Sequence, residues 1–226
     1  LEKGKYSFNS QNIDLKYLQS RDFMSDAKKL RGSIMLVGPL LARFGQASIP
    51  RPGGDKIGRR RLDTHFINLQ KLGAKLNYNS ENKMYSVTSK NSLEGTNILL
   101  DEASVTGTAN ILMASILANG QTTIYNAACE PYIQQLCLLL NKMGANIQGI
   151  GSNLLKINGV KSLGGADHNI LPDMIEIGSW IGLAAMTRSK LKIKNVSWDN
   201  LGQIPDVFRK LGISIERKGD DILIPE

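Results

Sequence analysis

The stretch Gln70-Lys71-Leu72-Gly73-Ala74-Lys75-Leu76 occurs three times in this chain with small changes, and this repeat decides the fold. The later copies are Asn141-Lys142-Met143-Gly144-Ala145-Asn146-Ile147 and Arg209-Lys210-Leu211-Gly212-Ile213-Ser214-Ile215, with glycines 71 and 68 residues apart. Each copy follows a run with apolar residues three or four positions apart, which is helical spacing, as at Ile133, Leu136, Leu140 and Met143. We therefore expect each glycine to end a helix in the left-handed conformation and a strand to follow.

A second helix recurs between these junctions. Small and apolar residues predict helices over residues 32–44, 107–118 and 176–186, each leading through a turn into an alternating strand such as 122–125 or 191–194. A single Leu-Gly-Ala after a helix is a common capping solution, but three copies in register, each with a second matching helix, indicate a true repeat. The repeated unit is a βαβαββ-like module of about 70 residues.

The helices of this module are apolar around much of their circumference, notably over residues 111–118. Such helices are typical of a buried position. The sequence therefore predicts an α/β (α+β) protein with helices inside and sheets outside, the reverse of the usual doubly wound layering.

The excess of basic over acidic residues in the chain indicates an anionic ligand. The chain has 226 residues, 42% of them apolar, and a net charge of +8, which suits nucleic acid, an anionic membrane or a phosphorylated small molecule. The densest basic cluster follows Pro52-Gly53-Gly54 and consists of Lys56, Arg59, Arg60 and Arg61. Because no aromatic residue that could stack a base lies among them, compact phosphates are favoured over single-stranded nucleic acid.

Other features place the chain in a reducing compartment. No apolar run approaches the roughly 20 residues that cross a bilayer, and the start has neither Met nor a signal core, which indicates a segment of a longer cytoplasmic protein. Cys129 and Cys137 are expected to be core thiols too far apart for a disulfide. The two histidines, His65 and His168, are 103 residues apart, so no metal site is expected.

The stretch from Arg51 to His65 carries the most specific signal. Its glycines, Gly53, Gly54 and Gly58, make the backbone permissive, and its basic residues could neutralise phosphates when the stretch closes over a ligand. We expect a lid; the alternative is a solvated basic turn before a helix that begins near Asp63.

The same stretch resembles the catalytic loop of the UDP-N-acetylglucosamine enolpyruvyl transferases, through its Pro-Gly-Gly, Ile-Gly, Arg and Asp-x-His positions. Residues 31–45, Ser104-Val105, Asn126-Ala127-Ala128 and Leu171-Pro172-Asp173 follow in the order and spacing of that family, so the resemblance covers residues 28–226. It implies an inside-out α/β barrel of the enolpyruvyl-transferase type, in two lobes of three modules each. Residues 1–170 would then be the first lobe and 171–226 an incomplete part of the second.

The resemblance implies transfer of the enolpyruvyl group of phosphoenolpyruvate to the 3′-hydroxyl of UDP-N-acetylglucosamine, with release of phosphate and without a cofactor. That reaction is the first committed step of peptidoglycan synthesis, and so belongs to cell wall biogenesis, cell shape and cell division. Two alternatives stay open: the sister activity on shikimate 3-phosphate, and a noncatalytic module that binds a phosphate ligand or nucleic acid. No membrane insertion is expected, and the rest of the polypeptide is the expected partner.

The resemblance also implies the site residues. Asp55 stands where the general acid of the family, often a cysteine, stands, and Arg31 and Arg60 match positions that grip substrate phosphates. The uridine end would be held by Arg60, Arg61, Leu62, Asp63 and Thr64 together with Glu102, Ala103, Ser104 and Val105. Glu102 replaces a frequent lysine and Arg61 a usual proline, so Arg61 could restore the charge lost at Glu102. His65 matches in position, but it could be structural as readily as it could touch a ligand.

Asp55 needs a raised pKa to act as an acid. Its reference value is about 3.9, and the flanking Lys56, Arg59 and Arg60 would lower it. We expect closure and the phosphoenolpyruvate anion to raise it. A carboxylate at this position also implies resistance to fosfomycin, which alkylates the loop cysteine of relatives. Because the other half of the site is missing, the chain alone is expected to be inactive.

Overall fold

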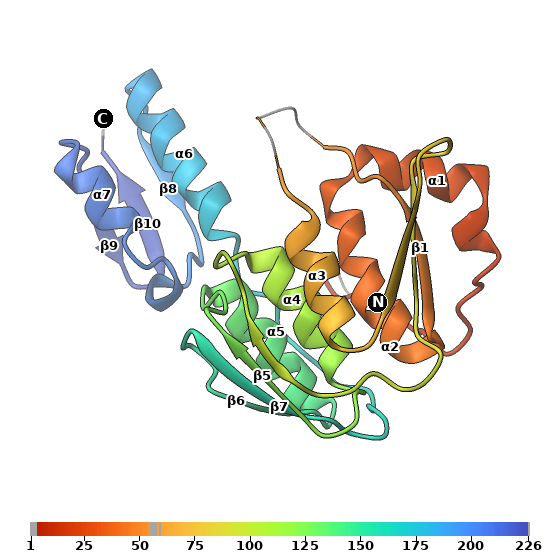
Figure 1. Ribbon diagram of the computed structural model, residues 1–226. Coiled ribbons are helices and arrows are strands. Elements are labelled where there is room, and N and C mark those ends of the chain that lie inside the picture. The colour runs from red at the N-terminus through yellow and green to blue at the C-terminus, as the bar shows by residue number, and fades with distance from the viewer. Residues whose placement is uncertain (1–3, 55–57, 59, 226) are drawn as a thin grey trace. The chain divides into compact units, whose positions relative to one another are not determined.

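The computed structural model describes residues 4–54, 58 and 60–225 (Figure 1). The chain forms two compact units, residues 1–166 and 167–226. The lobe boundary expected at residue 170 stays a prediction. None of the helices in the described ranges is long and apolar enough to cross a membrane.

The first unit contains five α-helices and seven strands in its described part. The helices are α1 (Arg21–Lys29), α2 (Val37–Phe44), α3 (Asp63–Lys71), α4 (Val105–Ser115) and α5 (Pro131–Lys142), with 3-10 turns η1 (Tyr17–Gln19) and η2 (Arg31–Leu36). The strands are β1 (Gln46–Pro50), β2 (Lys75–Asn79), β3 (Met84–Thr88), β4 (Asn97–Leu99), β5 (Gln121–Tyr125), β6 (Asn146–Gln148) and β7 (Leu154–Asn158).

The second unit is smaller and is described by itself. Its elements are α6 (Met174–Thr187), β8 (Leu191–Ile193), η3 (Trp198–Asn200), α7 (Ile204–Lys210), β9 (Glu216–Lys218) and β10 (Asp221–Ile224). Asp173 caps α6 by accepting hydrogen bonds from the N–H groups of Ile175 and Glu176. The helix expected in this region is confirmed.

The three repeated junctions share one backbone motif. Gly73, Gly144 and Gly212 have φ of 98°, 103° and 85°, so the expected left-handed caps are confirmed. In the first copy the N–H of Gly73 bonds the carbonyl of Gln70 at 2.9 Å and the N–H of Ala74 that of Leu69 at 3.1 Å. This pair of bonds is the Schellman motif, and the same pair recurs after α5 and α7.

The strands repeat with the helices. The described strands form three open sheets, ordered β1-β3-β2, β4-β5-β7-β6 and β8-β10-β9. In each copy the last strand of the module lies between the other two and runs antiparallel to both. Among the described residues only the middle module has the first strand of a βαβαββ unit, β4, which pairs in parallel with β5. The mixed α/β class is therefore confirmed, whereas the described strands close no barrel.

Helix α4 lies at the centre of the first core. It contacts α2, α3 and α5, and Figure 1 shows it between these helices. Ile111 and Leu112, on neighbouring positions, are fully buried, as its apolar circumference predicted. The second core lies around Ile181 of α6 and, in the described part of the chain, has no residue in common with the first.

Two local predictions need correction. The helix expected over residues 32–44 is a 3-10 turn followed by α2, because Pro39 lacks an N–H and could not complete an α-helix that began earlier. Cys129 is exposed rather than a core thiol, because it precedes α5 instead of lying on it. Cys137 is buried as expected, and burial raises its pKa to about 11.

Candidate functional site

The start of the glycine-rich stretch lies directly on the segment that carries Arg31. A β-carbon on Gly53 would stand 1.7 Å from the carbonyl oxygen of Lys28, and one on Gly54, whose φ is 93°, would stand 3.1 Å from the β-carbon of Arg31. Pro52 before them is buried. The glycines are therefore required for close approach as well as for backbone freedom.

Three arginines gather at this contact. Burial lowers the pKa of Arg31, and the positive charges of Arg60 and Arg51 lower it further. In the part of the chain that the structure describes, no ion pair joins any of the three to a carboxylate. Cations that repel one another are stabilised by an anion, and guanidinium groups match the geometry of phosphate.

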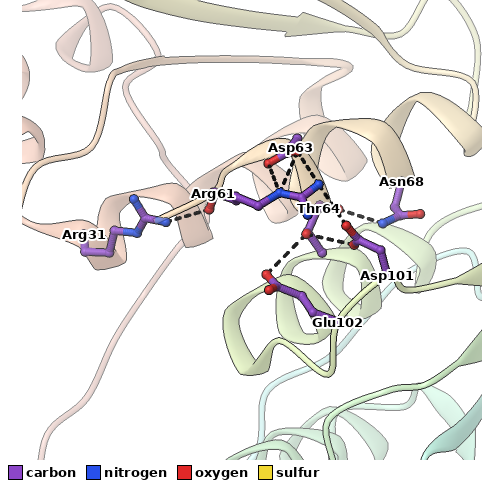
Figure 2. A network of polar contacts seen from close by, with 7 residues as sticks. All are labelled: Arg31, Arg61, Asp63, Thr64, Asn68, Asp101 and Glu102. Carbon is purple, nitrogen blue, oxygen red and sulfur yellow. Dashed lines mark hydrogen bonds and ion pairs between the residues drawn. The ribbon is translucent and has the colours of Figure 1, made fainter. Parts of the chain in front are cut away.

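Arg61 lies in a different environment (Figure 2). Its Nε donates to Oδ1 and Oδ2 of Asp63 at 3.1 and 2.9 Å, and its Nη2 donates to Oδ2 of Asp63 at 2.5 Å. The same Nη2 forms an ion pair with Oδ2 of Asp101 at 3.0 Å. The hydrogen bond and charge of Asp63, followed by the charge of Asp101, raise the pKa of Arg61. The Arg61 carbonyl accepts a 2.7 Å hydrogen bond from Nη2 of Arg31.

Two acidic residues that follow β4, Asp101 and Glu102, contact the start of α3. The buried hydroxyl of Thr64 lies 3.0 Å from Oδ1 of Asp101 and 3.4 Å from Oε1 of Glu102. Two residues further on, Ser104 caps α4 by accepting from the N–H of Gly107 at 3.1 Å. The segments 60–64 and 102–105, expected to act together, are thus neighbours in space.

His65 is part of the packing beneath the site. It is 2% exposed, its Nδ1 lies 3.1 Å from Nδ2 of Asn110, and its Nε2 lies 3.5 Å from the hydroxyl of Thr106. Since the Asn110 amide donates, Nδ1 is the unprotonated nitrogen. Burial, helped by the charge of Arg31, lowers the pKa of His65 to about 4, so the ring is neutral near pH 7. The structural interpretation of His65 is the one that these contacts favour.

Asn110 joins three segments at one point. Its Oδ1 accepts from the N–H of Gly38 at 2.6 Å and its Nδ2 donates to the carbonyl of Ile34 at 3.1 Å, besides the contact with His65. Asn110 therefore holds η2, which carries Arg31, against α3 and α4.

The structure thus brings together most of the predicted residues. Arg31, Arg60, Arg61, Asp63, Thr64 and Glu102 lie in one region, with Leu62, Ala103, Ser104 and Val105 on the same two segments. Asp55, the predicted acid, lies outside the described residues. Sequence reasoning included Arg51 only as the first residue of the basic stretch, and it missed Asp101 and Asn110. The one available signal was that Asp101 is a charged residue two positions after β4.

The fold defines a class of protein. Residues 9–225 match the family model described as EPSP synthase (3-phosphoshikimate 1-carboxyvinyltransferase), and the chain belongs to this family. Solved structures of similar fold include the enolpyruvyl transferase NikO from Streptomyces tendae, with a TM-score of 0.74 at 17% identity, covering 91% of this chain and 49% of that one. EPSP synthase from Acinetobacter baumannii has a TM-score of 0.60 at 18% identity and covers 86% and 46%.

Relatives of higher identity carry a more particular name, UDP-N-acetylglucosamine 1-carboxyvinyltransferase. The chain is 64% identical to that of Bacteroides fragilis over 97% of this chain and 50% of the relative. Identity is 62% to that of Bacteroides thetaiotaomicron and 60% to that of Porphyromonas gingivalis, with the same coverage. The chain therefore spans about half the length of the curated relatives it matches.

Proposed function

We propose that this chain is part of an enzyme that transfers the enolpyruvyl group of phosphoenolpyruvate to the 3′-hydroxyl of UDP-N-acetylglucosamine, releasing phosphate. The observation that carries the proposal is the 60–64% identity to relatives of that name over 97% of the chain. The cluster of Arg31, Arg51 and Arg60 supports it, because both substrates carry phosphate groups. This assignment places the protein at the first committed step of peptidoglycan synthesis, in the cytoplasm.

The reaction is an addition followed by an elimination. A proton joins the methylene carbon of phosphoenolpyruvate, and the oxygen of the sugar hydroxyl attacks the neighbouring carbon as the hydroxyl gives its proton to a base. The tetrahedral intermediate then loses phosphate and a proton from its new methyl group. The first step needs a placed acid and the second needs cations that hold the leaving phosphate. Arg31 and Arg60 are the cations that we assign to substrate phosphates, with the Arg60–Thr64 and Glu102–Val105 segments at the uridine end.

Asp55 is the acid that we assign. Its carboxyl must be protonated before the reaction, so loop closure and the phosphoenolpyruvate anion have to raise its pKa. Because Asp55 acts in its protonated form, kcat should fall as the pH rises through a pKa above the ordinary carboxyl value of about 3.9. A pH–rate profile without such a fall would contradict this assignment. A carboxylate is a poorer nucleophile than a thiolate, so we expect the enzyme with Asp55 to resist alkylation by fosfomycin. Asp55→Cys should restore sensitivity.

The architecture that we propose has two lobes. The first unit would supply the loop-bearing lobe, the second unit would begin the other lobe, and the complete lobes would be inside-out barrels with central helices such as α4. Because half of the relatives' length lies outside this chain, we expect the 226-residue chain alone to show no turnover.

The test uses the full-length protein that contains this chain. Phosphate release is measured with phosphoenolpyruvate and either UDP-N-acetylglucosamine or shikimate 3-phosphate as acceptor. The proposal predicts turnover with the first acceptor and none with the second; the reverse would establish the sister activity that the family model's description names. Turnover with neither acceptor, combined with a shift of nucleic acid in a gel, would favour the noncatalytic alternative.

Two variants make the activity assay specific to the site. Arg31→Ala should lower kcat/KM by roughly a hundredfold, since it removes a charged contact to phosphate. Lys192→Ala is the matched control, because this cation lies in the second unit and pairs with Asp221 at 2.8 Å. It should leave kcat/KM within about twofold of the parent value.

A further inference from the structure

We propose that Asp101 is a positioning residue which, by holding the side chain of Arg61, sets the direction in which Arg31 presents its guanidinium. The inference rests on the proposed function, because it assigns a role within the proposed phosphate site. It goes beyond that function in linking the second module to a residue of the first through a three-residue chain of polar contacts (Figure 2).

The backbone of Asp101 is anchored by the residue before it. Leu100 is 1% exposed; its N–H donates to the carbonyl of Tyr125 at 3.1 Å, and its carbonyl accepts from Nδ2 of Asn126 at 3.0 Å. Both partners belong to the end of β5 and the turn after it. The carboxylate therefore projects from a fixed point of the central sheet rather than from a free loop.

Both carboxylate oxygens of Asp101 are used at the start of α3. Oδ1 accepts from the Thr64 hydroxyl at 3.0 Å, and Oδ2 meets Nη2 of Arg61 at 3.0 Å. Leu62, at the N-cap of α3, makes no side-chain capping bond, so this end of the helix lacks the usual local support. Asp101 does not cap these N–H groups, but it ties the side chain of Thr64 in the first turn of α3 to another module.

The Arg61 side chain is fixed by two carboxylates of the protein, which gives it a structural role rather than a role in binding an anion. Asp63 binds its Nε and Nη2 and Asp101 binds Nη2, so two carboxylates surround one guanidinium. A cation in such a setting attracts a phosphate weakly, because the surrounding charge is already negative. This arrangement separates Arg61 from Arg31, Arg51 and Arg60, which have no carboxylate partner among the described residues.

The backbone of Arg61 transmits this fixed position to Arg31. Its carbonyl accepts from Nη2 of Arg31 at 2.7 Å, which leaves the other donors of the planar guanidinium pointing in set directions. If the Arg61 side chain loses its carboxylate partners, the peptide that carries this carbonyl can rotate. The Arg31 guanidinium then no longer has a fixed orientation. A misdirected guanidinium binds phosphate less well without affecting the acid step.

The test compares single and double variants in the full-length enzyme. Asp101→Asn, Arg61→Ala and the double variant are measured for KM of each phosphorylated substrate, kcat and Tm. The single variants should raise KM for at least one substrate by roughly tenfold and lower kcat by less than about threefold. The double variant should be no worse than Arg61→Ala, because both changes break one chain of contacts. Asp101→Glu should recover part of the loss.

The control is an ion pair of the same kind outside the site. Asp206 and Arg209 pair at 2.8 Å with half-exposed side chains, much like Asp101 and Arg61. Asp206→Asn should leave both KM values unchanged. The inference is overturned if the parent enzyme turns over but Asp101→Asn keeps the parent KM values, if the KM effects of the two single variants multiply in the double variant, or if only Tm falls. A parent without turnover would instead refute the proposed function.

Discussion

Gly53 shows how tightly the glycine-rich stretch is seated on its neighbours. Its α-carbon faces the backbone of Lys28, and the nearest atoms that a side chain would meet are carbonyl atoms rather than a flexible side-chain end. A backbone neighbour cannot move aside without distorting α1, whose last residue is Lys29. At the scale of the residue, the site thus depends on the absence of a methyl group.

Gly53→Ala should therefore lower the free energy of unfolding of the first unit by about 2 kcal/mol, as overpacking does. Chemical denaturation followed by circular dichroism measures the change. Gly32→Ala is the matched control, since a β-carbon there meets nothing within 4 Å. Equal stability of the two variants would show that the stretch can move away from Lys28.

His65 predicts a pH dependence of stability. Its pKa is about 4 in the folded state against about 6.5 when unfolded, so below pH 6.5 the unfolded chain binds the proton more readily. Its contribution is complete above pH 6.5 and is lost as the pH falls toward 4. Between pH 7.5 and 5 the loss should be about 2 kcal/mol.

The measurement is urea denaturation of the chain and of His65→Gln at several pH values. The variant is expected to be less stable at pH 7.5, where the neutral ring packs best, but to lose less stability on acidification. Parallel curves for the two proteins would mean that another group carries the pH dependence.

At the scale of the element, the three modules are built on one helix ending. Each Schellman glycine has a positive φ, and a β-carbon on any of the three would meet nothing within 4 Å. Their requirement for glycine is thus one of backbone conformation rather than of space, and it is the same in all three modules.

Gly73→Ala, Gly144→Ala and Gly212→Ala should each destabilise the unit that contains them by about 1 kcal/mol, the strain of a left-handed alanine. Gly165→Ala serves as the control, because it has neither a positive φ nor a near neighbour. Denaturation midpoints of the four variants provide the comparison. A loss confined to one of the three junctions would show that the repeats are not equivalent.

At the scale of the whole molecule, the two units have separate cores. Ile111 is fully buried in the first and Ile181 in the second, and the two cores share none of the described residues. Separate cores permit separate opening of the two units.

Ile181→Ala should remove about 3 kcal/mol from the second unit and leave the first unchanged, whereas Ile111→Ala should do the reverse. Hydrogen exchange followed by mass spectrometry measures the protection of both units in one sample, with peptides from β5 reporting on the first unit and peptides from β10 on the second. Ile67→Ala, at a half-exposed position, is the control. Loss of protection in both units from either core variant would show that they unfold as one.

Local patterns account for what could be predicted here. The helix spacing and the glycines after α3, α5 and α7 act within a few residues, so the sequence alone predicted the repeated module and the mixed α/β class. The resemblance to the enolpyruvyl transferases, rather than a local pattern, predicted that residues 60–64 and 102–105 act together, and that role stays a prediction.

The rest depended on contacts between distant residues. Asp101 reaches Thr64 across 37 positions and Asn110 reaches Gly38 across 72, and no local pattern marks either pair. The sequence by itself determined the modules, their caps and which basic residues the glycine-rich stretch carries. Only the tertiary structure decided that Arg61 pairs with acids while Arg31, Arg51 and Arg60 gather without a carboxylate partner among the residues that the structure describes. The reason is that the role of a charge depends on the neighbours that folding gives it.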